Sequence, residues 1–63
     1  MHILAGQSQT FQNQTINEPI RNDGELIIID CVVNGEITGT GNLTAKGGST
    51  FNKSVTQNNI TVG

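Results

Sequence analysis

The sequence repeats at intervals of about 17 residues, and this repeat constrains the fold more than any other feature. Windows that begin at Glu25, Asn42 and Asn59 align with one another, and a looser window runs from Ser8 to Gly24. The second position of the last three windows is aliphatic and the fourth position of all four is apolar: Leu26, Leu43 and Ile60, then Phe11, Ile28, Ala45 and Val62. Short units that repeat at such a period are typical of solenoids.

The repeat slips by one residue in its third window. Ile20 and Ile37 share the thirteenth position, but Val55 falls one residue late, and the step from Val33 to Phe51 shows the same slip. One additional residue at a corner of the third unit would produce it.

The residue types predict short strands and no helix. Ile, Val and Thr are abundant, and no segment carries an apolar stripe with helical spacing. The clearest strand runs from Leu26 to Val33 between turn signals at Asn22-Asp23-Gly24 and Asn34-Gly35. Shorter strands are expected at 10–15, 36–38, 42–45, 50–52, 54–56 and 59–62.

Together these features predict an all-β fold, a short β-solenoid (parallel β-helix) of about 17-residue rungs. A small β-sandwich or open barrel is the alternative. We expect a single β domain over residues 1–63, with rungs over 25–63 and an N-terminal cap over 1–24 that includes Pro19.

Four segments resemble bactofilin-type β-helices and the rungs of filamentous-haemagglutinin-type passengers. They are GEL at Gly24–Leu26, VVNGEI at Val32–Ile37, GNLTAKGGS at Gly41–Ser49 and NITVG at Asn59–Gly63. The resemblance covers residues 25–62 and is one of composition and period. The bactofilin likeness implies cytoplasmic head-to-tail polymerisation without a nucleotide. The chain is far shorter than such β-helices, and Met1–Gly24 has no counterpart. Haemagglutinin-type passengers are secreted, which disagrees with the lack of a signal sequence.

Composition excludes several functional classes. The chain has only three basic and two aromatic residues. This composition argues against a nucleic-acid binder, because such proteins need a basic footprint and stacking platforms. No apolar run approaches the length of a membrane span, and the N-terminus lacks the charge pattern of a signal peptide. The single cysteine, Cys31, favours a reducing compartment, and we expect a cytoplasmic protein.

No residue pattern predicts catalysis, a cofactor site or a metal site. Asp30 interrupts an apolar strand and is interpreted as a solvent-facing bend, and Cys31 as a small packed side chain. His2 is the only histidine and follows the initial Met1. Asp23 and Glu25 have a spacing that glycosidases also use, but they flank a predicted turn. We therefore expect a protein that is not an enzyme.

Self-association is the expected activity, because a 63-residue chain without staples buries little surface by itself. Ile27, Ile29 and Cys31, with Val33, have the opposite parity to Leu26, Ile28 and Val32. They are predicted to form an outward seam of a homodimer or trimer. The alternative is a fully enclosed central strand of a sandwich, which would also be apolar on both faces. Ile60 and Val62 are predicted to lie at an open end of the coil. The acidic residues all precede residue 37 and the two lysines follow it, which favours head-to-tail stacking.

Two other functions fit the same sequence. One is a small phage or mobile-element accessory protein that binds and inhibits a host protein. The other is a fragment of an adhesin passenger or viral fibre. Partners are therefore other copies of the chain or another protein, and not nucleic acid.

Overall fold

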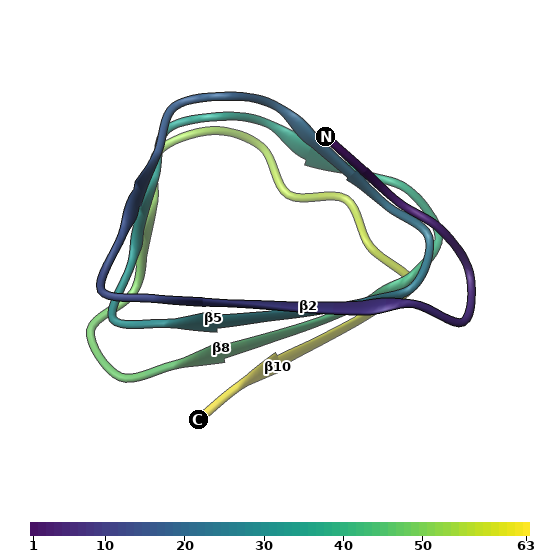
Figure 1. The fold of residues 1–63 in the computed structure, drawn as a ribbon. Coiled ribbons are helices and arrows are strands. Elements are labelled where there is room, and N and C mark those ends of the chain that lie inside the picture. The colour runs from purple at the N-terminus through teal and green to yellow at the C-terminus, as the bar shows by residue number, and fades with distance from the viewer.

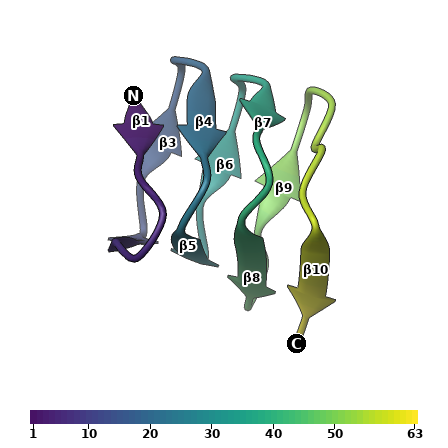
Figure 2. The same ribbon diagram turned by 90° about the vertical axis from the view of Figure 1, so that its right-hand side faces the viewer.

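The chain winds into a three-sided β-solenoid. A computed structural model describes residues 1–63 and contains ten strands and no helix (Figures 1 and 2). The strands are β1 (His2–Ile3), β2 (Ser8–Gln12), β3 (Thr15–Ile16), β4 (Ile20–Asn22), β5 (Glu25–Ile29), β6 (Val32–Val33), β7 (Ile37–Thr38), β8 (Asn42–Lys46), β9 (Thr50–Phe51) and β10 (Asn59–Val62). The predicted all-β solenoid is confirmed.

Each side of the solenoid is one parallel sheet. The sheets have the strand orders β1-β4-β7, β10-β8-β5-β2 and β3-β6-β9. We call them the first, second and third sheets. The second sheet is the widest side, because its strands have four or five residues whereas most others have two. A rung is short because a corner follows each strand, and Gly, Asn and Asp fill most corners.

The register follows the predicted period. In the second sheet Ser8 pairs with Glu25, Glu25 with Asn42, and Asn42 with Asn59. The third sheet shows the predicted slip, because Val32 pairs with Thr50. The extra residue lies in the corner between β8 and β9, where Gly47, Gly48 and Ser49 replace the two-residue corner of the previous rung. Like residues therefore stack from coil to coil.

The interior is a narrow apolar column. Nine residues form the core cluster: Ile3, Ile16, Ile20, Leu26, Ile28, Cys31, Val33, Ile37 and Leu43. Leu26 and Leu43 continue one inward row of the second sheet, and Ile28 and Ala45 continue the next. Stacked aliphatic side chains of this kind account for most of the burial that a small chain can achieve.

The corner that follows each strand of the second sheet changes which side chains of the next strand point inward. Asn13, Asp30 and Gly47 all have positive φ values, of 54°, 50° and 68°, at equivalent corners. Short polar side chains and glycine tolerate this backbone conformation. Asp30 is exposed, as predicted for a bend, and its Oδ1 accepts a hydrogen bond from the backbone N–H of Gly48 at 2.9 Å.

The prediction that Cys31 faces outward with Ile27 and Ile29 is wrong. Cys31 is fully buried, Val33 is buried, and Val32 is exposed. Alternation with a period of two holds only within a strand, and the corner at Asp30 restarts it.

The expected N-terminal cap over residues 1–24 is also replaced by regular coil. β2 and β3 pair in parallel with β5 and β6 in the same register as the later rungs. Pro19 lies in the corner before β4, where it needs no ladder hydrogen bond. The looser repeat hides this rung in the sequence, because Gln9 stands where later rungs have Leu26 and Leu43.

Candidate functional site

The C-terminal end of the solenoid exposes an unpaired strand edge. β10 pairs with β8 on one side and has no neighbour on the other (Figure 2). Ile60 and Val62 continue the inward rows of Leu43 and Ala45, but no further coil covers them. They are 52% and 79% exposed. This places both predicted residues at the open end.

The edge of β10 carries none of the usual protections. It contains no proline, no charged residue and no bulge, whereas natural edge strands commonly use such features to avoid pairing. Its backbone continues the parallel pattern, since the N–H of Gly63 donates to the carbonyl of Ala45 at 2.9 Å. We name β10 with Ile60 and Val62 the open edge.

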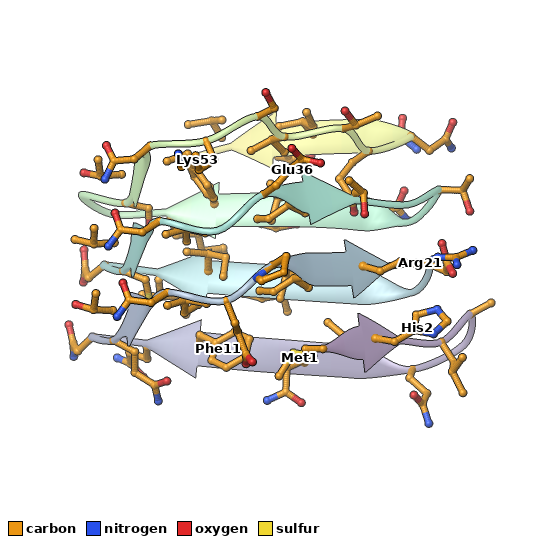
Figure 3. The ribbon with its side chains drawn as sticks, turned by 90° about the horizontal axis from the view of Figure 1, so that it is seen from above. Met1, His2, Phe11, Arg21, Glu36 and Lys53 are labelled. Carbon is orange, nitrogen blue, oxygen red and sulfur yellow. The ribbon has the colours of Figure 1, made fainter.

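The opposite end exposes other side chains. Ile3 and Ile16 in the first coil are only 5% and 6% exposed, whereas Met1 and Leu4 are 47% and 51% exposed. Phe11 is partly buried and packs against the core cluster, and it lies within the first coil in Figure 3. Hollows at this end are lined mostly by polar residues and have volumes of about 470 Å³ and about 360 Å³. The two ends are therefore chemically different.

The predicted lateral seam is incomplete. Ile27 and Ile29 lie on the outer face of β5 and are partly buried by neighbouring side chains. Their neighbours on β8 are Thr44 and Lys46, and those on β2 are Thr10 and Gln12. Without Cys31 the outward apolar surface consists of two half-covered isoleucines in a polar surround.

Stacked asparagines line one corner of the coil. Asn34 Nδ2 donates to Asn17 Oδ1 at 2.8 Å, and Asn52 Nδ2 donates to Asn34 Oδ1 at 2.6 Å. A second pair, Asn59 Nδ2 to Asn42 Oδ1 at 3.0 Å, lies beside the open edge. This ladder was not predicted from the sequence, although its members follow the same 17- and 18-residue steps as the apolar rows.

A polar pair occupies the interior at another corner. Asn22 is fully buried, and its Nδ2 donates to Gln57 Oε1 at 2.6 Å and to the carbonyl of Asn42 at 2.9 Å. Its Oδ1 accepts from the N–H of Gly24 at 3.1 Å. Gln57 Nε2 in turn donates to the carbonyl of Thr38 at 2.9 Å. This pair joins residues two coils apart.

His2 and Asp23 meet on the surface. His2 Nε2 lies 2.8 Å from Asp23 Oδ2, and Arg21 Nε lies 3.2 Å from the same oxygen. Asp23 Oδ1 accepts from the N–H of Thr40 at 3.2 Å. These contacts lower the pKa of Asp23 below its ordinary value of 3.8, with the hydrogen bond from His2 as the largest cause and that from Thr40 second. His2 and Thr40 reach Asp23 from the two neighbouring coils, whereas Arg21 is two residues away in the same coil.

Stability should therefore depend on pH through Asp23. A carboxylate with a lowered pKa stabilises the folded chain at pH values above 3.8, and this contribution is lost as the pH falls through the lowered value. We expect the thermal midpoint of the wild-type chain to fall more steeply below about pH 4 than that of Asp23→Asn. Parallel curves for the two proteins would contradict this assignment.

Neither cysteine nor metal chemistry is assembled in the structure. Cys31 Sγ donates to the carbonyl of Ile29 at 3.1 Å and is buried in the core cluster. No group of three or more His, Cys, Asp or Glu residues lies close enough together to hold a metal ion. There is also no helix of the length and hydropathy needed to cross a membrane.

Comparison with known proteins adds no relative. No family model, curated protein or solved structure matches the chain. The resemblance to bactofilin-type β-helices stays a prediction, and the candidate site rests on the geometry of the coil.

Proposed function

We propose that this chain is a non-enzymatic structural protein that assembles with copies of itself through the open edge. The observation that carries the proposal is the exposure of Ile60 and Val62 on a strand whose outer backbone is unpaired. Covering these side chains removes apolar surface from water, and pairing the strand adds backbone hydrogen bonds.

The size of the end predicts weak association. The solenoid measures 26 × 22 × 16 Å, so a triangular end offers roughly 300 Å² to a partner, well below the ~800 Å² per partner of a standard interface. We therefore expect assembly that grows with protein concentration rather than a permanent complex.

The test is light scattering after size exclusion over a range of concentrations. The wild-type chain should show a mean mass that rises above 6.7 kDa as concentration increases. The double variant Ile60→Lys/Val62→Lys should stay monomeric, because charged side chains at an edge oppose pairing.

A matched control separates the end from the side. Ile27→Lys/Ile29→Lys introduces the same charges at the same spacing on the outer face of β5. It should assemble like the wild-type chain. If this variant fails to assemble while Ile60→Lys/Val62→Lys still assembles, the contact between copies is the lateral seam and not the open edge. Circular dichroism establishes that both variants remain folded.

A further inference from the structure

We propose that the partner on the open edge is β2 of a second copy, docked parallel and in register so that Asn59 lies opposite Ser8. This inference rests on the proposed self-assembly and specifies its geometry. It makes the assembly a polar, head-to-tail stack in which the second sheet continues from copy to copy, since such heterologous contacts do not close into a dimer.

The two edges have complementary backbones. Because the N–H of Gly63 donates to Ala45, the alternation of a parallel strand turns the backbone groups of Ile60 and Val62 to the free edge. At the other end, the N–H of Asn13 donates to the carbonyl of Ile29 on the β5 side of β2. By the same alternation, Ser8, Thr10 and Gln12 present their backbone groups to the free edge of β2. The docking repeats the pairing that β8 already makes with β10.

The side-chain rows also continue across the joint. In this register Thr61 meets Thr10 on the outer face and Val62 meets Phe11 on the inner face, as the internal pairs of these rows do. The contact of Val62 with Phe11 is apolar on both sides. In the other inward row, Ile60 meets the polar side chain of Gln9. An exposed Val62 and a partly covered Phe11 are both shielded by this contact.

Charge favours this orientation over two C-terminal ends face to face. Lys53 lies two residues after the end of β9, and Glu18 lies two residues after the end of β3. They therefore occupy the same corner at opposite ends of the solenoid. Stacking head to tail brings Lys53 of one copy towards Glu18 of the next. Two C-terminal ends would instead bring the lysines of both copies together, which costs free energy.

The joint leaves one strand position empty on the third side. The second sheet has four strands, and Val55 extends the first sheet by a bridge to Ile37, but the third sheet has only three strands. When the first two sheets are continuous, β9 and the next β3 stand about 10 Å apart, which is two strand spacings. Lys53 and Glu18 lie at the corner of this opening, and their long side chains reach across it.

Cross-linking tests the register directly. Thr10 and Thr61 are exposed on the outer face, and the only native thiol is buried. A mixture of Thr10→Cys and Thr61→Cys chains, treated with a short thiol cross-linker, should yield a dimer that contains one chain of each kind. Either variant alone should yield no cross-linked dimer. The wild-type chain, whose only thiol is the buried Cys31, is treated in the same way as the control.

The other outcomes are distinct. A dimer formed by Thr61→Cys alone would show two C-terminal ends face to face and overturn the register while leaving self-assembly intact. A monomer at every concentration in light scattering would overturn both proposals.

Charge reversal gives a second, independent readout. Lys53→Glu should shift assembly to higher concentration. Lys53→Glu/Glu18→Lys should restore it, because both residues are exposed and the double variant again places opposite charges at the joint. Failure of the double variant to recover would overturn the head-to-tail orientation.

Discussion

Replacing Gly35 with alanine is expected to unfold the chain. A Cβ atom on Gly35 would overlap the carbonyl oxygen of Glu18 and would lie 2.9 Å from the nitrogen of Pro19. These are backbone atoms of the neighbouring coil, so no side chain can move aside. The two coils would have to separate at this corner, breaking the adjoining ladder of β3 and β6.

The cost is large compared with the stability of such a chain. Overpacking against rigid backbone destabilises by about 4 kcal/mol or more, whereas a domain of this size has roughly 3–9 kcal/mol in total. Denaturation by urea, followed by circular dichroism, measures the change. We expect no cooperative transition for Gly35→Ala, or one at much lower urea concentration.

Gly48→Ala is the matched control. A Cβ atom there meets nothing within 4 Å, and its φ is not in the left-handed region. Alanine should be neutral, or stabilising by about 0.4–1 kcal/mol, because it restricts the unfolded chain. Equal effects of the two alanines would contradict the close approach of the coils at Gly35.

Replacing the buried Asn22 with leucine should cost about 3 kcal/mol or more. The change leaves Gln57 Oε1, the carbonyl of Asn42 and the N–H of Gly24 without their partner inside the coil. A part-buried polar group that loses its partner retains much of its cost of desolvation, and the added apolar surface does not offset three such groups. Urea denaturation again provides the measurement.

Two comparisons make this prediction specific. Asn58→Leu changes the same residue type at an exposed corner and should shift stability by about 0.5 kcal/mol or less. A double-mutant cycle between Asn22 and Gln57 should show a coupling of at least about 1 kcal/mol. Additive effects of the two substitutions would mean that the hydrogen bond between them contributes little.

The architecture could be predicted from the sequence because each coil of the solenoid corresponds to one repeat along the chain. Each inward row recurs in the sequence at the spacing of one coil, so Leu26, Leu43 and Ile60 can be aligned without any knowledge of the third dimension. The slip at Val55 was readable for the same reason. The first coil was not recognised as a rung, because Gln9 stands where the later rungs have Leu26 and Leu43.

The candidate site divides in the same way. Ile60 and Val62 were placed at an open end by extending the repeat, and the structure leaves both exposed. Cys31 was misplaced because alternation within a strand says nothing about the direction that follows a corner, and the positive φ of Asp30 decides it. The contact of Asn22 with Gln57 was invisible because it spans two coils and breaks the apolar row.

The residue types and the repeat were enough to predict that this chain forms strands, how many residues each coil contains and which residues stack. Those properties follow from the preference of the residues for β-strands and from a repeat that places equivalent positions of neighbouring coils on top of one another. The folded coil was needed to learn which side of each corner faces inward and which buried polar groups satisfy one another. These depend on backbone angles at single residues and on contacts between coils, which no periodic pattern of residue types specifies.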